Sequence, residues 1–222
     1  MTAPSDSLVE FTDLLRGFGR VPVLAGVSGQ ARTGQVLLVT GSNGSGKSTL
    51  LRCLAGLLRP QAGTIRLRED GRELDAVERR RRVGYVAPDL AFYEPLTAEE
   101  NLTFFCRLRG VPARRAVELL ATLGVPARRA AGALSSGMRQ RLRWAWALLH
   151  QPRLLLLDEP FQNLDEAGEA AVRTLLDSHL EDGLAVIATP SPLLVPRLAA
   201  TLDLSRHHAA SDRPTAGRAG TA

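Results

Sequence analysis

Residues 41–49 read Gly41-Ser42-Asn43-Gly44-Ser45-Gly46-Lys47-Ser48-Thr49 and fit the pattern G-x-x-x-x-G-K-[ST] of a phosphate-binding loop. Lys47 is the only lysine in the chain, and every other residue among the 28 lysines and arginines is an arginine. A compact ammonium on a thin stem can enter a cradle of backbone N–H groups, whereas a broad, planar guanidinium cannot. The stretch therefore predicts a bound nucleoside triphosphate.

The flanking residues give this loop the strand–loop–helix context that the pattern requires. Residues 35–40 form a short apolar run typical of a buried strand, and residues 48–58 have helical spacing that ends before Pro60. Similar apolar runs predict further buried strands at 83–87, 153–157 and 185–188. Helical spacing recurs at 98–109, 113–123, 139–149 and 166–180. This order predicts an α/β fold with a helix-rich insert at about 97–134.

Within the loop, backbone N–H groups from Asn43 to Ser48 are expected to surround the phosphates at the start of the helix, where the helix dipole favours anions. Lys47 is expected to bridge the β- and γ-phosphates of ATP, and Thr49 to contact the α-phosphate. The Ser48 hydroxyl is expected to ligate Mg²⁺. The alternative is a glycine-rich turn with a surface lysine, which the flanking strand and helix disfavour.

A second candidate site follows a buried strand. Residues 154–157 are four leucines, and Asp158, Glu159 and Pro160 come directly after them. Ligands of open α/β sheets lie at the carboxyl ends of the strands, so we expect both acids to face the nucleotide. Asp158 is expected to hold Mg²⁺ through water, and Glu159 to orient and deprotonate the water that attacks the γ-phosphate. Two acids that merely cap the next helix are the alternative.

A third candidate site is the signature stretch, residues 134–141, which reads Leu-Ser-Ser-Gly-Met-Arg-Gln-Arg. A serine and a glycine that open a helix create a second anion site, because N–H groups and a hydroxyl converge there. The chain already has one phosphate cradle. The simplest interpretation is that Ser135 and Gly137 serve a nucleotide held by another copy of the chain.

The order of these motifs resembles that of the ATP-binding subunits of ABC transporters, and the resemblance covers about residues 9–203. It implies an ABC-type P-loop nucleotide-binding domain over residues 1–204, with a mixed-sheet core and a helical subdomain at about 97–134. Residues 205–222 lack periodicity, and we expect a disordered tail there. The family binds ATP and Mg²⁺, hydrolyses ATP and drives a separate transmembrane permease.

The resemblance also assigns roles to individual residues. Two ATP molecules are expected between head-to-tail subunits, each contacting Lys47 of one subunit and both Ser135 and Gly137 of the other. Asp165 matches the end of a loop that crosses the dimer axis. Phe18 matches the aromatic residue that stacks on adenine, with an ordinary core aromatic as the alternative. Trp144 and Trp146 are interpreted as packing residues.

Two residues that the family usually has are missing. Alignment places Pro88 where a glutamine normally contacts Mg²⁺ and senses the permease, and Pro190 where a histidine normally grips the γ-phosphate. Proline offers neither a side-chain oxygen nor an N–H group. Asp89 could supply a carboxylate instead, whereas His179 comes too early in the chain to replace the histidine. Loss of one charge-stabilising contact can cost roughly 10²–10³ in rate, so we expect slow hydrolysis unless partner subunits reshape the site.

Composition bounds the remaining alternatives. The net charge is +5 and aromatic residues make up 5% of the chain, so we expect no nucleic-acid partner. Residues 1–7 have neither the basic start nor the apolar core of a signal peptide, and no apolar run is long enough to span a bilayer. We therefore expect a peripheral protein at the cytoplasmic face of the cell membrane. Cys53 and Cys106 fit small core residues in a reducing compartment.

Three functional interpretations compete. The first is a transporter ATPase, whose signature stretch and Trp144-Ala145-Trp146 segment are similar to the haem exporter of cytochrome c biogenesis. An ABC-2-type exporter of another cargo is equally compatible. The second is a soluble ABC ATPase that acts on ribosomes or DNA, and the third is a degenerate subunit that binds ATP and barely hydrolyses it. The surface at 89–108 is expected to receive the permease, although Phe92, Phe104 and Phe105 could be core residues instead.

Overall fold

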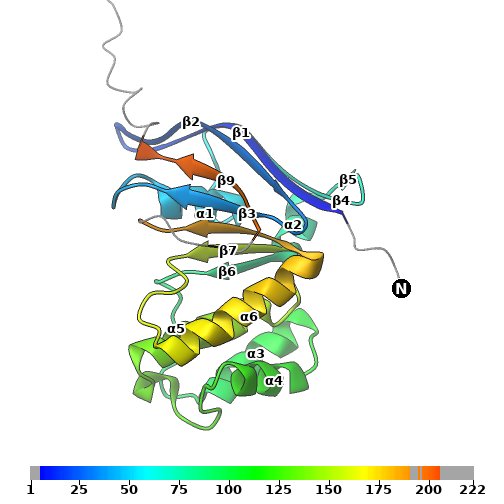
Figure 1. Cartoon of the computed structure of the whole chain (residues 1–222), viewed down its shortest axis with the longest axis vertical. Helices are drawn as coiled ribbons and strands as arrows, with labels where there is room; N and C mark the ends of the chain where they lie inside the picture. Colours follow the sequence, from blue (N-terminus) through cyan, green and yellow to red (C-terminus); the bar gives the residue numbers. More distant parts are fainter. Residues whose placement is uncertain (1–5, 191–194, 196, 206–222) are drawn as a thin grey trace, which may run out of the picture.

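The computed structural model describes residues 6–190, 195 and 197–205, and its elements form stacked layers of two sheets and a group of helices (Figure 1). The predicted α/β class is confirmed. The tail expected at 205–222 falls, from residue 206 onward, outside the described residues. Among the described residues, no helix combines the length and the apolar character needed to cross a lipid bilayer.

The central sheet has five parallel strands in the order β6-β7-β8-β3-β9. Its strands are β3 (Val36–Thr40), β6 (Val83–Val86), β7 (Leu154–Asp158), β8 (Leu184–Ala188) and β9 (Leu198–Asp203). Four of them were predicted, with ends that differ by one residue. The fifth, β9, was not predicted, because its residues are exposed or half-buried and lack the apolar run of the others.

A second, antiparallel sheet of order β2-β1-β4-β5 was not predicted from the sequence. Its strands are β1 (Ser7–Phe18), β2 (Val21–Arg32), β4 (Ala62–Glu69) and β5 (Arg72–Glu73). Register shifts interrupt the pairing of β1 and β2 at three places, so the alternation of apolar and polar residues that marks a strand is broken. The two sheets together give the mixed-sheet core that the resemblance implied.

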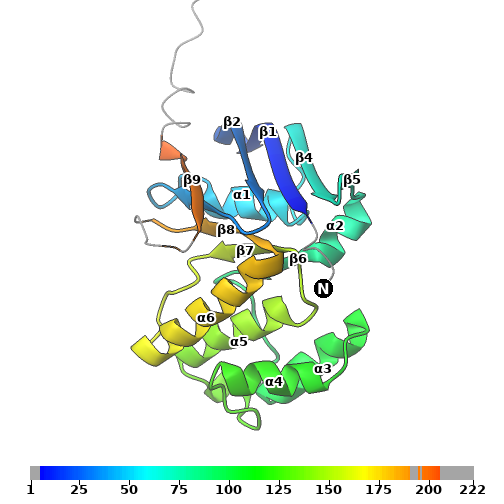
Figure 2. The same ribbon diagram turned by 45° about the vertical axis from the view of Figure 1, so that its right-hand side comes forward.

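The helices lie on both faces of the central sheet (Figures 1 and 2). Helix α1 (Lys47–Leu54) lies between the two sheets, and α5 (Ser136–Leu148) and α6 (Glu166–Asp182) cover the other face. The remaining helical segments are α2 (Ala76–Arg82), α3 (Ala98–Arg109), α4 (Arg114–Thr122) and the 3₁₀ turn η1 (Ala131–Ala133). Helix α3 has the predicted bounds.

Two predicted helix boundaries were wrong by three or more residues, each for a local reason, and the other predicted helices differ by at most two residues at either end. The helix expected at 48–58 ends at Leu54, because the C-cap Ala55 is followed by Gly56 with a φ of 73°. The helix expected at 139–149 begins at Ser136, because the Ser135 side chain accepts a hydrogen bond from the N–H of Met138 and caps it.

Alternation along the central strands separates two hydrophobic cores. On β7, Leu154 and Leu156 pack with α1 and the antiparallel sheet, whereas Leu155 and Leu157 pack with the helices of the opposite face. The phosphate-loop helix and the signature helix therefore start on opposite sides of the same sheet. Cys53 and Cys106 are buried free thiols, one in each core.

Candidate functional site

Lys47 opens α1 and directs its side chain back onto the loop that precedes the helix. Its ammonium donates hydrogen bonds to the carbonyl oxygens of Gly41 at 2.7 Å and Ser42 at 2.9 Å, and the residue is only 6% exposed. Ser45 is buried as well, and its hydroxyl has no hydrogen-bond partner in the part of the chain that the structure describes. A buried cation with neutral partners beside an unpaired hydroxyl is an environment that a phosphate would complete.

The glycines of the loop are required by its close packing. Gly46 is the N-cap of α1 with a φ of 97°, and a Cβ there would lie 2.9 Å from Cγ1 of Val23. Gly41 has a φ of 144°, and its Cβ would lie 2.5 Å from Oγ of Ser45. Only glycine fits both positions. No side chain caps α1, so its first N–H groups remain available to a ligand.

Asp158 and Ser48 meet at the edge of the central sheet. Ser48 is close enough to the carboxyl group of Asp158 to lower the pKa of that group, and Asp158 is 3% exposed. Burial raises the pKa of this carboxyl group and the charge of Glu159 adds to the rise, while the Ser48 hydroxyl opposes it. A hydroxyl and a carboxylate are the hard oxygen ligands that Mg²⁺ prefers. Among the described residues no group of three or more His, Cys, Asp or Glu could hold a metal ion, so a cation here would need water or phosphate oxygens as well.

Glu159 has a left-handed backbone conformation, with a φ of 47°, that is uncommon outside glycine. Its N–H donates to the carbonyl of Ala188 at 2.9 Å, and its own carbonyl accepts from Nε2 of Gln140 at 3.2 Å. The next carbonyl, that of Pro160, accepts from Nε2 of Gln140 and from Nε1 of Trp144, both at 3.0 Å. Strand β8 and helix α5 thus hold the strained backbone in place from two sides.

The residues of the signature stretch and of the loop before α6 act within the chain as helix caps. Ser135 is exposed and caps α5, and Asp165 caps α6 by accepting a hydrogen bond from the N–H of Gly168 at 2.9 Å. Gly137 is half-buried, and a Cβ there would lie 2.6 Å from the carbonyl oxygen of Asn163. The roles of Ser135, Gly137 and Asp165 toward a nucleotide stay predictions.

Phe18 lies at the end of β1 and is 51% exposed, so it is not a core residue. The guanidinium carbon of Arg16 lies 4.9 Å from the centre of its ring. An exposed ring with one cationic neighbour could stack on a base. Its adenine contact stays a prediction.

The two prolines sit where parallel strands end. Pro88 follows β6 and Pro190 follows β8, and the carboxyl ends of parallel strands share one sheet edge with the phosphate loop and Asp158. The carboxylate of Asp89 forms an ion pair with Arg52 of α1 at 2.8 Å. Arg52 would therefore compete with a metal ion for this carboxylate. His179 is hydrogen-bonded to the carbonyl of Leu184 at the opposite end of β8 and does not replace the missing histidine.

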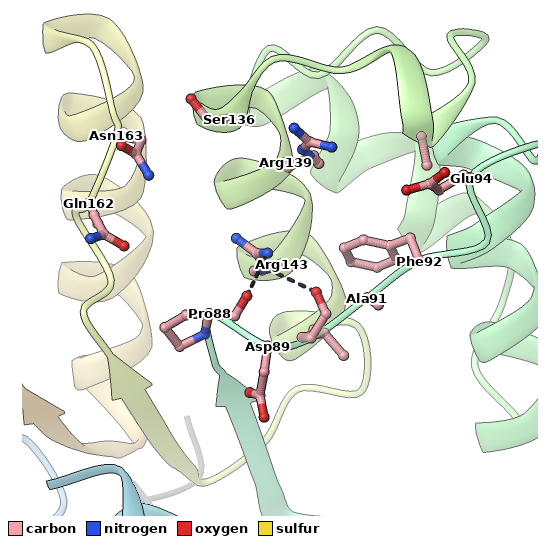
Figure 3. A pocket seen from close by; sticks show the side chains of 12 residues that line it. Pro88, Asp89, Ala91, Phe92, Glu94, Ser136, Arg139, Arg143, Gln162 and Asn163 are labelled. Carbon is pink, nitrogen blue, oxygen red and sulfur yellow. Dashed lines mark hydrogen bonds between the residues drawn. The ribbon is translucent and has the colours of Figure 1, made fainter. Parts of the chain in front are cut away.

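A pocket of about 380 Å³ lies beside Pro88, between the turn that follows β6 and helix α5 (Figure 3). Phe92 lines this pocket and is partly buried against the core, as is Phe105, whereas Phe104 is 44% exposed. The surface expected at 89–108 therefore combines two partly buried aromatics with two exposed rings, those of Tyr93 and Phe104.

Three residues of the site, Gln140, Trp144 and Arg143, were not recognised from the sequence. Gln140 lies within the signature stretch, and Trp144 and Arg143 follow at helical spacing, so their shared helix was visible. Apart from the hydrogen bond between Arg143 and Gln140, their partners are the backbone carbonyls of residues 88, 90, 159 and 160, and no residue pattern reveals such contacts. Trp144 is fully buried, as expected of a packing residue.

Comparisons with known proteins agree with this geometry. A family model described as "ABC transporter" matches residues 24–162. The methionine import ATP-binding protein MetN of Mesorhizobium japonicum is 37% identical over 194 residues, and the bacitracin transport ATP-binding protein BcrA of Bacillus licheniformis is 33% identical over 191 residues. These alignments cover 82% and 85% of the chain, which spans only 53% and 62% of the two relatives.

A solved structure has the same fold. The dimeric structure of an ATP-binding cassette bound to ADP and phosphate superimposes with a TM-score of 0.71 and 26% sequence identity, covering 82% of this chain and 88% of that one. The two relatives above are named for methionine import and bacitracin transport. They do not support the expected similarity to a haem exporter.

Proposed function

This chain belongs to the ABC transporter family, and from that premise we propose that it is the ATP-binding and ATP-hydrolysing subunit of a membrane transporter. The observation that carries the proposal is the placement of Lys47. Its buried ammonium has only neutral carbonyl partners in the described chain, on a glycine loop packed too closely for other residues. A triphosphate would bring negative charge to the ammonium and to the uncapped N–H groups at the start of α1.

The hydrolytic step is assigned to Glu159. Its carboxylate accepts a proton from water as the water oxygen attacks the γ-phosphorus, and ADP leaves with the electron pair of the bridging bond. Lys47 neutralises charge on the β- and γ-phosphates during this step. Ser48 and Asp158 would hold Mg²⁺, which when bound neutralises phosphate charge. Pro88 and Pro190 supply no side-chain contact, so we expect turnover to be slow without a partner.

Two copies of the chain are proposed to share two ATP molecules. Lys47 and Ser135 lie at the starts of helices that pack on opposite faces of the central sheet, so one nucleotide reaches both most simply across a dimer. The dimeric cassette bound to ADP and phosphate supports this arrangement by analogy. Phe18 would stack on adenine, and Asp165 would lie near the dimer axis.

A transmembrane permease is the proposed partner, with the chain at the cytoplasmic face of the membrane. The pocket beside Pro88 and the exposed ring of Phe104 are the proposed contact region. The proposal of haem export for cytochrome c biogenesis rests only on local sequence similarity in the signature stretch and the Trp144–Trp146 segment. The names of the relatives suggest methionine or bacitracin as the cargo, and these two cargoes are as well supported for this chain as haem.

The experiment that tests the transporter role is purification of the tagged chain from native membranes in mild detergent. A co-purifying permease supports it, and haem absorbance in the complex would favour haem as the cargo. Recovery with ribosomes or DNA and without any membrane protein would contradict it.

ATP binding and hydrolysis by the same purified chain distinguish an active ATPase from a degenerate subunit. If ATP binds and Glu159→Gln leaves an already negligible hydrolysis unchanged, the chain binds ATP without acting as the hydrolytic partner. The two prolines are the observation that favours this second candidate.

A further inference from the structure

Arg143 of α5 holds the turn after β6 with two nitrogens of its guanidinium group (Figure 3) and binds Gln140 with the third. Nη2 donates to the carbonyl of Pro88 at 2.7 Å, and Nε donates to the carbonyl of Leu90 at 3.1 Å. Nη1 donates to Oε1 of Gln140 at 3.0 Å, one helical turn away. Figure 3 shows both hydrogen bonds to the turn at the wall of the pocket. A fork of fixed donors is required to reach three separate oxygens at once.

The hydrogen bond to Gln140 fixes which way its side-chain amide faces. Because Oε1 accepts from Arg143, Nε2 faces the other way and donates to the carbonyls of Glu159 at 3.2 Å and Pro160 at 3.0 Å. Gln140 is 4% exposed, so no bulk water substitutes for these partners. A continuous series of hydrogen bonds thus joins the turn at 88–90 to the backbone of Glu159.

We propose that Arg143 is a positioning residue that couples the turn at 88–90 to Glu159 through the amide of Gln140. The proposal rests on the proposed function, in which Glu159 is the hydrolytic base. Pro88 has no side-chain oxygen or N–H, and its carbonyl provides the link instead. Glu159 has a left-handed backbone that its neighbours must maintain, so a displaced turn changes the position of its carboxylate.

The test compares Arg143→Ala and Arg143→Lys with Arg107→Ala in the full chain. Arg107 is an exposed arginine near the end of α3, outside the pocket, and serves as the control. We expect Arg143→Ala to lower kcat by about tenfold to a hundredfold, because a misplaced catalytic group costs rate, with KM for ATP within about twofold. Arg143→Lys should stay impaired, since one ammonium cannot serve three separated carbonyl and amide oxygens. Full recovery with lysine would overturn the proposal.

A double-mutant cycle tests whether Arg143 acts through Gln140. Gln140→Met keeps the side-chain volume and removes both polar atoms. If the amide is the link, the double variant should lose no more kcat than the more impaired single variant. If the loss of kcat in the double variant equals the product of the two single losses, Arg143 and Gln140 act independently and the proposal is contradicted.

Hydrogen exchange supplies a readout that does not need hydrolysis. In Arg143→Ala the backbone amides of Glu159, Phe161 and Gln162 should exchange at least about tenfold faster than in the wild type, and Arg107→Ala should leave them unchanged. If the wild type failed to hydrolyse ATP while this difference appeared, the proposed function would fail and the link itself would stand. Unchanged exchange in Arg143→Ala would refute the link whatever the ATPase activity.

Discussion

A Cβ atom on Gly137 would lie 2.6 Å from the carbonyl oxygen of Asn163, so the first turn of α5 touches the loop before α6 through its backbone. This contact joins the helix that carries Ser135 to the segment that ends at Asp165. Both residues cap their helices. Ser135 is predicted to face the nucleotide of a second subunit, and Asp165 to lie near the dimer axis. The geometry of that predicted interface therefore depends on the absence of a side chain at one position.

Gly137→Ala is expected to destabilise this contact, because a methyl group cannot approach a carbonyl oxygen so closely. Overpacking of this kind costs about 1–3 kcal/mol, and ATP-dependent dimerisation should weaken as well. Thermal unfolding and light scattering with ATP measure the two effects. Gly132→Ala is the milder comparison, since its Cβ would lie 3.1 Å from Cβ of Glu94 and needs a shift of only a few tenths of an ångström. Equal behaviour of the two variants would contradict the steric argument.

Lys47→Arg is expected to abolish ATP binding although it preserves the charge. The ammonium is buried between two carbonyls at 2.7 and 2.9 Å, and a guanidinium is too broad for this position. Titration calorimetry with ATP should show at least about a hundredfold weaker affinity, with thermal stability near that of the wild type. Arg79→Lys makes the opposite exchange on α2, away from the loop, and should bind ATP normally. Wild-type affinity in Lys47→Arg would exclude this loop as the cradle.

Trp144→Phe is expected to lower the free energy of unfolding by about 1–3 kcal/mol. The change removes the hydrogen bond from Nε1 to Pro160 and leaves a small cavity around a fully buried ring. Trp146→Phe is a matched comparison, because Nε1 of Trp146 has no partner among the described residues and its ring packs on Phe105. Urea denaturation should show the larger loss for Trp144→Phe. The reverse order would indicate that ring packing, not the hydrogen bond, dominates.

Acid is expected to destabilise the fold through His179. Burial, with a smaller contribution from Arg153, lowers its pKa from 6.5 to about 4, although the hydrogen bond to Leu184 and the charge of Asp182 oppose the shift. The unfolded chain therefore takes up a proton before the folded one, and stability falls as the pH drops from about 6.5 to about 4. The full loss is about 3 kcal/mol for this residue.

Urea denaturation across this pH range measures the His179 effect. His179→Gln should show a shallower decline than the wild type, because one proton uptake is removed. His150, whose pKa burial also lowers to about 4, still contributes in both proteins. Parallel declines for the two proteins would show that His179 does not carry this dependence.

The sequence predicted those parts of the fold whose signal is local. Four apolar runs became strands of the central sheet, and the phosphate loop lies between β3 and α1 as its pattern required. The antiparallel sheet escaped prediction because bulges interrupt the alternation of β1, and β9 because it lacks an apolar run. At the site, the sequence could name Lys47, Asp158 and Glu159 by residue type. It could not reveal that Arg143 and Gln140 bind backbone carbonyls, since any residue supplies a carbonyl oxygen.

The most direct test of the proposed mechanism compares ATP binding and ATP hydrolysis in the wild type and in Glu159→Gln. The amide keeps the size of the carboxylate and cannot accept the proton of the attacking water. We predict unchanged ATP affinity, a loss of kcat of at least about a hundredfold, and accumulation of an ATP-bound dimer. Wild-type turnover in Glu159→Gln would contradict the assignment of Glu159 as the base and, with it, the proposed mechanism of this chain.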